Sequence, residues 1–123
     1  MAKIVLCIDD QPIRFCTLRQ KLNKIDPDIA VVVTCRIDDF FWYINSPDKI
    51  LGVCLDHDMP YKEGPFFAEQ LGEFNYPVAI VSQNPSGVAT LEATLNYWGV
   101  KNKITNCAWN NWEDLAIEFF EIR

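Results

Sequence analysis

Residues 3–10 read KIVLCIDD, an apolar run that ends abruptly in two aspartates. A second run of the same kind, LGVCLDHD, covers residues 51–58. Short continuous apolar runs are typical of strands in a parallel sheet, because helices cover both faces of such a strand. We therefore expect two buried strands, over 3–8 and 51–55, each followed at its carboxyl end by acidic residues.

Strand and helix signals alternate along the rest of the chain. Apolar runs predict three further strands, at 29–34, 77–81 and 103–105. Spacing and stop signals predict five helices: after Pro12, with Ile13, Leu18, Leu22 and Ile25 at near-helical spacing; from Asp38 or Asp39 to Ile44; over 66–71; over 88–98, ended by Gly99; and after Asn110 or Asn111, with Leu115, Ala116, Phe119 and Ile122 facing inward.

The resulting order is βαβαβαβαβα, without an internal repeat or a linker-like stretch. Such alternation predicts an α/β fold, and we expect one flavodoxin-like domain over residues 1–123 with a five-stranded parallel sheet and helices on both faces. Ligands of such sheets bind outside the carboxyl ends of the strands. The informative polar residues of this sequence fall at those ends.

Charge and hydropathy narrow the classes of partner. The net charge of −6 repels long polyanions, so we expect no duplex nucleic acid as a partner. A small phosphorylated ligand or a nucleotide remains open, because a bound divalent cation reverses the local field. No apolar run approaches the roughly 20 residues of a membrane span, so we expect no membrane partner.

The cysteines indicate a reducing compartment. Their number, five, is odd, none has Cys-x-x-Cys spacing and no signal peptide precedes them, so we expect a cytoplasmic location. Cys7 and Cys54 lie inside apolar runs and are expected to be small core residues. With His57 as the only histidine, a tetrahedral zinc site has too few ligands.

Carboxylates follow both buried strands. Asp9 and Asp10 end the first strand, and Asp56 and Asp58 end the third. In a flavodoxin-like sheet these strands are neighbours, so the four carboxylates converge. Such crowding favours a cation, and oxygen ligands suit Mg²⁺ or Mn²⁺. The alternative is that these are ordinary polar residues at the junctions of strands and loops.

A second polar group follows the fourth strand. Ser82 and Asn84 lead into a turn that ends at Gly87 and opens a helix, whose free backbone N–H groups are suited to bind a phosphate. The alternative is a plain helix start, with Asn84 or Ser86 as the cap and Pro85 in the first turn.

Other residues near these strand ends allow two interpretations. His57 could transfer a proton, but alternation along an extended segment turns it away if Asp56 and Asp58 face the pocket. Lys101 and Lys103 could pair with a phosphate or could be solvated. Trp109 and Trp112 could stack on a base if they are exposed.

The chain resembles the receiver domains of two-component response regulators. The resemblance rests on Asp9-Asp10, the segment 56–60 with Gly64, and Ser82. It implies Mg²⁺ bound by Asp9, Asp10 and Asp56, with Asp56 as the phosphoacceptor and Ser82 as the hydroxyl on the phosphoryl group. Receivers also have a lysine and a proline after the fifth strand, where this chain has Asn106-Cys107. Lys101 or Lys103 would have to take the place of that lysine.

A second resemblance is to the receiver-like family named for cyclic-phosphate processing. It combines the segment 55–58 with Ser82-x-Asn84-Pro85-x-Gly87 and Leu91-Glu92. It implies action on a cyclic phosphate of nucleotide type. Members usually have a histidine before the serine, where this chain has Val81.

Three hypotheses follow from these residues. The first is a metal-dependent phosphoesterase or binder of a small cyclic phosphate, in which Asp58 orients water, His57 is available for proton transfer, and Ser82, Asn84 and Gly87 bind the phosphate. In it, Asp56 is either a ligand of the metal or the nucleophile. The second is a signalling receiver that is phosphorylated on Asp56 and changes its protein partner. The third is a pseudo-receiver that serves as an interaction surface.

Overall fold

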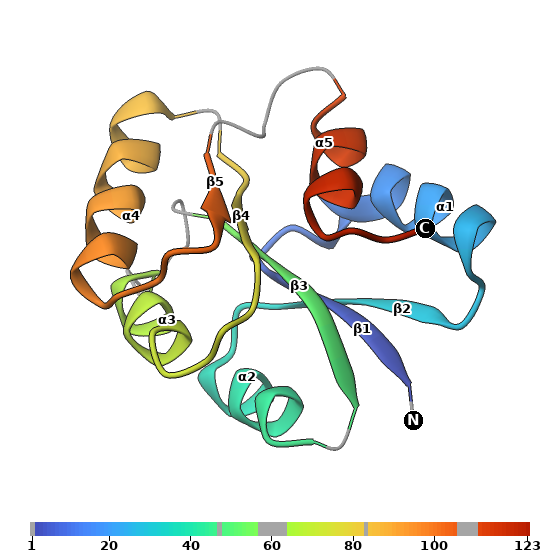
Figure 1. Cartoon of the computed structure of the whole chain (residues 1–123), viewed down its shortest axis with the longest axis horizontal. Coiled ribbons are helices and arrows are strands. Elements are labelled where there is room, and N and C mark those ends of the chain that lie inside the picture. Colours follow the sequence, from blue (N-terminus) through green and yellow to red (C-terminus); the bar gives the residue numbers. More distant parts are fainter. Residues whose placement is uncertain (1, 47, 57–63, 83, 106–110) are drawn as a thin grey trace.

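Five parallel strands form one sheet in the computed structural model, which describes residues 2–46, 48–56, 64–82, 84–105 and 111–123 (Figure 1). The strands are β1 (Lys3–Ile8), β2 (Ile29–Thr34), β3 (Lys49–Leu55), β4 (Val78–Ile80) and β5 (Lys103–Ile104). Their order across the sheet is β2-β1-β3-β4-β5, which confirms the flavodoxin-like order expected from the sequence.

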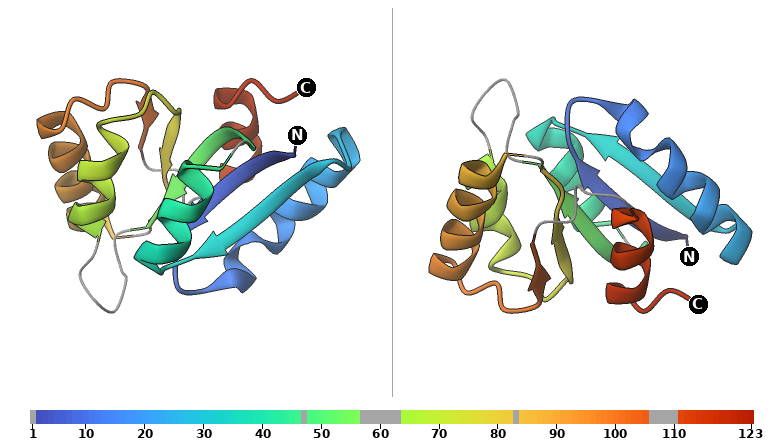
Figure 2. Two further views of the ribbon diagram at one scale, coloured as in Figure 1. Left: turned by 90° about the horizontal axis from the view of Figure 1, so that it is seen from below. Right: turned by 90° about the horizontal axis from the view of Figure 1, so that it is seen from above.

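Helices cover both faces of this sheet (Figure 2). They are the 3₁₀-helix η1 (Pro12–Phe15) and the α-helices α1 (Cys16–Ile25), α2 (Ile37–Ile44), α3 (Gly64–Leu71), α4 (Pro85–Tyr97) and α5 (Trp112–Phe119). α2, α3 and α4 lie on one face, and α1 and α5 lie on the other. Among the described residues, no helix combines the length and apolar character that crossing a bilayer requires.

The central strand β1 supplies side chains to two apolar cores. Ile4, Leu6 and Ile8 pack in the core beneath α2, α3 and α4. Val5 and Cys7 pack in the other core, with side chains of α1 and α5. Residues 4–8 are each at most 3% exposed, which confirms a strand covered on both faces.

Three apolar positions of the predicted helical patterns are exposed, and the inward position predicted for Leu115 is wrong. Ile13 is 78% exposed and Ile25 is 40% exposed, whereas Phe15 is buried. For Ile13 the reason is that residues 12–15 form a 3₁₀ turn, whose three residues per turn shift the phase of the helical pattern. In α5, Leu115 is 53% exposed and Ile117 is buried in its place.

The ends of β1 and β3 are level with each other. Ile8 pairs with Leu55 in the parallel register, and the Asp56 N–H donates to the Ile8 carbonyl at 3.0 Å. On the other side of β1, the Asp9 N–H donates to the Thr34 carbonyl at 3.0 Å. Backbone hydrogen bonds therefore place both aspartates at the same edge of the sheet, as the sequence predicted.

Candidate functional site

Three carboxylates meet at this edge of the sheet. Asp9, Asp10 and Asp56 each offer one oxygen, and these oxygens lie within 4.8 Å of one another. Asp9 and Asp56 are only 1% and 2% exposed, whereas Asp10 is open to solvent. The cluster is thus partly buried, with exposed Asp10 at its rim, and we call it the acidic pocket.

A guanidinium enters the same pocket from the turn that follows β1. Arg14 Nη1 donates to Asp9 Oδ2 at 2.7 Å and lies 3.3 Å from Asp56 Oδ2. Arg14 Nη2 donates to the Val81 carbonyl at 3.2 Å. The predictions from sequence missed Arg14. Pro12 was an available signal, since it predicts a helical turn directly after the strand, and such a turn brings residue 14 back to the strand ends.

Burial raises the pKa of Asp9 from 3.8 to about 6. Burial is the main cause, and the neighbouring Asp56 charge and a hydrogen bond with Asp10 act in the same direction. The Gln11 N–H, which donates to Asp9 Oδ1 at 2.8 Å, and the Arg14 charge lower the pKa. These two groups offset only part of the cost of burying the Asp9 charge.

The other wall of the pocket comes from the end of β4. Val81 is level with Asp56, because Leu55 pairs with Ile80 and the Val81 N–H donates to the Leu55 carbonyl at 2.9 Å. Ser82 follows and is 1% exposed. Its hydroxyl oxygen accepts the Asn84 N–H at 3.2 Å, so the serine is held at the strand end.

The start of α4 follows directly. Asn84 occupies the N-cap position and Pro85 lies in the first turn, as the plain helix-start alternative predicted. Within the described ranges, however, the Asn84 side chain makes no capping hydrogen bond to the helix backbone, and its Oδ1 accepts the Ser86 hydroxyl at 2.9 Å instead. Gly87, in the first turn, is buried.

The donor set of the pocket fits a divalent cation. Three carboxylate oxygens within one small volume are hard ligands, which Mg²⁺ and Mn²⁺ prefer over nitrogen or sulfur. Exposed Asp10 leaves a side open for water ligands, which Mg²⁺ usually retains. Asp9, Asp10 and Asp56 would hold such an ion, and the Arg14 guanidinium would have to share two of these carboxylates with it.

Several predicted site residues lie elsewhere or outside the described ranges. Asp58 and His57 lie outside the described residues, as do Asn106, Cys107 and Trp109. Lys103 stands at the start of β5, level with Val78, and its Nζ donates to the Val100 carbonyl at 3.0 Å, away from the carboxylates. Lys101 is exposed.

The described tryptophan of the proposed stacking wall packs into the protein. The Trp112 ring meets the ring of buried Phe15 edge to face, with centroids 5.8 Å apart. It is half-buried at the start of α5. The condition set for base stacking, an exposed ring, is therefore not met at Trp112, because this ring packs against Phe15 of the core.

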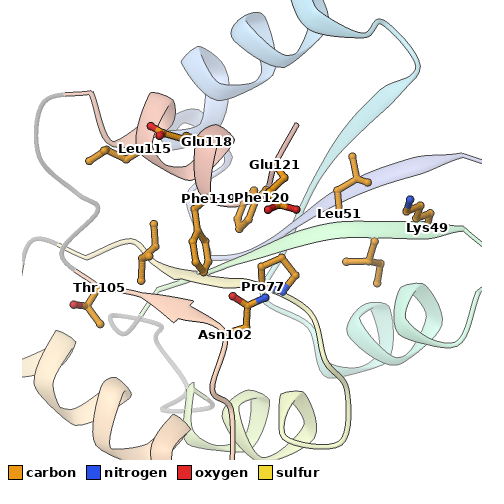
Figure 3. A pocket seen from close by; sticks show the side chains of 12 residues that line it. Lys49, Leu51, Pro77, Asn102, Thr105, Leu115, Glu118, Phe119, Phe120 and Glu121 are labelled. Atoms are coloured by element: carbon orange, nitrogen blue, oxygen red, sulfur yellow. The ribbon is translucent and has the colours of Figure 1, made fainter. Parts of the chain in front are cut away.

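A hollow lies at a different place, between α5 and the sheet (Figure 3). Its volume is about 1010 Å³, and its walls include residues at or before the starts of β3, β4 and β5. Leu115, Phe119 and Phe120 form its α5 side. It lacks the buried carboxylates of the acidic pocket.

Comparison with known proteins supports the receiver architecture. The signal receiver domain of the DNA-binding response regulator merR from Colwellia psychrerythraea 34H has a TM-score of 0.66 at 16% identity, covering 98% of this chain and 99% of that chain. A two-component response regulator from Legionella pneumophila has a TM-score of 0.67 at 15% identity, covering 99% and 97%. The BeF3-activated receiver domain of DrrB has a TM-score of 0.59 at 19% identity, covering 100% and 99%.

The chain has the receiver fold. Identities this low show the fold alone, and no model of a protein family and no curated protein sequence matches the chain. The structural likeness and the acidic cluster together support a receiver-like domain.

Proposed function

We propose that the chain is a signalling receiver that binds a divalent cation in the acidic pocket and accepts a phosphoryl group on Asp56. The observation that carries this proposal is the convergence of three carboxylate oxygens within 4.8 Å of one another at the end of β1 and β3. Buried Ser82 stands at the end of the next strand. The fold shared with response-regulator receivers supports the same function.

Each group that phosphoryl transfer to Asp56 needs has a candidate residue in the acidic pocket or beside it. An Asp56 carboxylate oxygen would form the new O–P bond, and the donor's O–P bond would break, with the electron pair leaving on the donor oxygen. A cation held by Asp9, Asp10 and Asp56 would neutralise charge on the phosphoryl oxygens. The Ser82 hydroxyl would donate a hydrogen bond to one of them, and the phosphorylated form would then change its protein partner.

Acetyl phosphate tests this function directly. With Mg²⁺, we expect the intact mass of the protein to increase by one phosphoryl group, and Asp56→Asn should abolish the increase, because an amide cannot form the acyl phosphate. Asp48→Asn is a suitable control, since Asp48 lies before β3, at the other end of the strand from the pocket. A mass increase that persists in Asp56→Asn would place the phosphoryl group elsewhere.

A second candidate function is the binding or hydrolysis of a small cyclic phosphate of nucleotide type. It is favoured by the start of α4, where the Asn84 side chain leaves the first backbone N–H groups uncapped within the described structure. These groups, with Ser82, Asn84 and Gly87, would bind phosphate oxygens beside the cation. Asp58 would orient the attacking water, and His57 would transfer a proton.

The two candidates separate in one set of assays. Purified protein with Mg²⁺ or Mn²⁺ would be offered 2′,3′-cyclic and 3′,5′-cyclic nucleotides, and hydrolysis would be followed by chromatography. Turnover that is lost in Ser82→Ala favours the second candidate. Phosphorylation by acetyl phosphate without binding of any cyclic nucleotide excludes it. Protein that binds neither Mg²⁺ nor any phosphate would be a pseudo-receiver that serves as an interaction surface.

A further inference from the structure

Arg14 is the residue whose guanidinium joins the three strand ends of the pocket. We propose that Arg14 is a phosphoryl-binding residue: it pairs with Asp9 and Asp56 when no cation is bound, and its Nη1 turns to a phosphoryl oxygen on Asp56 once a cation holds these carboxylates. The inference rests on the proposed function, because it concerns the same pocket. Its test is chosen so that the proposed function and the role of Arg14 can fail separately.

The position of the guanidinium is the first argument. Nη1 lies 2.7 Å from Asp9 Oδ2 and 3.3 Å from Asp56 Oδ2, so it stands beside an oxygen of the proposed acceptor carboxylate. Nη2 is anchored 3.2 Å from the Val81 carbonyl, directly before Ser82. One side chain therefore contacts both the acceptor carboxylate and the backbone directly before the serine.

The chemistry of the guanidinium is the second argument. Arginine keeps its charge at any ordinary pH, and its N–H donors lie on separate nitrogens, so one guanidinium can bind a carbonyl and a phosphate oxygen at once. Nη2 donates to a neutral carbonyl, which a cation in the pocket does not compete for. Nη1 contacts two carboxylates, the groups that a divalent cation would take. Only the Nη1 end would thus be released, while Nη2 keeps the side chain in place.

The burial of the side chain is the third argument. The Arg14 side chain is 28% exposed, whereas those of Asp9 and Asp56 are 0% and 2% exposed. The Arg14 side chain is therefore more open to solvent than the two carboxylates that it contacts. A residue that served only to neutralise the carboxylates would have no role once a cation had bound them.

Beryllofluoride, a phosphoryl mimic, and Mg²⁺ provide separate measurements of the two states. Calorimetry with Mg²⁺ alone should show about tenfold tighter binding by Arg14→Gln than by the wild type, because a competing positive charge is gone. Titration with beryllofluoride at saturating Mg²⁺ should show at least tenfold weaker binding by Arg14→Gln. Arg14→Lys should lose about fivefold, since one ammonium group cannot contact both the Val81 carbonyl and the ligand.

Arg19→Gln is a matched control. Arg19 Nη2 also donates to a strand carbonyl, that of Val31 at 2.9 Å. Arg19 is not among the residues of the acidic pocket. Its binding of Mg²⁺ and beryllofluoride should stay within twofold of the wild type. Circular dichroism of each variant at saturating Mg²⁺ reports whether it is folded, and Arg14→Lys carries the test if Arg14→Gln does not fold.

Three outcomes would overturn the inference. If beryllofluoride binds Arg14→Gln, or Arg14→Lys where only that variant folds, as tightly as the wild type, Arg14 is only a counter-ion of Asp9 and Asp56. If Arg14→Gln binds Mg²⁺ tenfold more weakly, the guanidinium supports the cation and is not displaced by it. Wild-type protein that binds neither Mg²⁺ nor beryllofluoride would instead overturn the proposed function, and the inference with it.

Discussion

The acidic pocket and the large hollow beside α5 differ in what their walls are made of. The pocket brings together Asp9, Asp56 and Arg14, whose side chains are at most 28% exposed and carry charge. The hollow is roomy, about 1010 Å³, and its α5 wall includes Phe119, Phe120 and Leu115. Burying charge is costly without specific partners, whereas apolar walls need none.

The difference teaches that the hollow and the acidic residues lie toward opposite ends of β3. In an open parallel sheet, ligands bind beyond the carboxyl ends of the strands, where the acidic pocket lies. The hollow includes residues such as Lys49 and Pro77 at or before the starts of β3 and β4. We therefore expect changes in the pocket to alter ligand binding, and changes around the hollow to alter stability alone.

The largest effect is expected from pH in the absence of divalent cations. The pKa of Asp9 is raised from 3.8 to about 6, so the folded protein binds more protons than the unfolded chain between these pH values. The free energy of unfolding should therefore decrease as pH rises from about 3 to about 7, by on the order of 3 kcal/mol. Urea unfolding across this range, with and without Mg²⁺, measures the decrease, and saturating Mg²⁺ should remove most of it.

Two variants make this pH experiment specific. Asp9→Asn should abolish most of the decrease, because the amide does not titrate. Asp26→Asn should leave it in place, since the pKa of Asp26 is lowered by its hydrogen bond with Lys3 and contributes in the opposite direction, with stability lost as pH falls. An unfolding free energy that rises steadily from pH 4 to pH 6 would contradict the assignment to Asp9.

A smaller effect is expected from a methyl group beneath the hollow. A Cβ on Gly52 would lie well inside contact distance of the Phe120 ring, which is itself only 6% exposed. Gly52→Ala should therefore lower the free energy of unfolding by about 1–3 kcal/mol through overpacking, while Mg²⁺ affinity stays within twofold. Thermal unfolding measures the loss, and adding Phe120→Leu should recover part of it. Unchanged stability would mean that α5 and Phe120 shift to make room for the methyl group without a loss of packing.

The smallest effect is expected at the rim of the hollow. Leu115 is 53% exposed, so Leu115→Gln removes little buried apolar area and should change the free energy of unfolding by less than about 0.5 kcal/mol. Binding of Mg²⁺ and beryllofluoride should not change. A loss above about 1 kcal/mol would instead indicate that this leucine is covered in solution, and sedimentation of the protein would then test for a second copy.

Much of the fold could be predicted because the apolar runs are short and their ends are sharp. The predicted bounds of the strands at 3–8 and 29–34 match β1 and β2. Inward positions were harder where local geometry changes, as at Ile13, because the sequence does not reveal that residues 12–15 wind as a 3₁₀-helix. The short α5 turns Ala116 and Ile117 inward, and a pattern spread over eight residues defines its buried face poorly.

The candidate site could be predicted only in part. The convergence of Asp9, Asp10 and Asp56 followed from the order of the strands, and it is confirmed. Their role as metal ligands stays a prediction, as do the roles of Ser82, Asn84 and Gly87. Arg14 was missed, because its contacts with β1, β3 and β4 depend on the path of one turn and not on any strand pattern.

The pairing of Cys7 with Cys54 across β1 and β3 has a practical consequence. Both side chains are fully buried, and burial, with a hydrogen bond to Cys54, raises the pKa of the Cys7 thiol well above its usual value. Alkylating reagents can reach these two sulfurs only when the sheet opens, whereas Cys16 is exposed from the start. Each of the paired cysteines lies two residues before a pocket aspartate. The rate at which they are alkylated therefore measures how much a bound ligand slows the opening of β1 and β3.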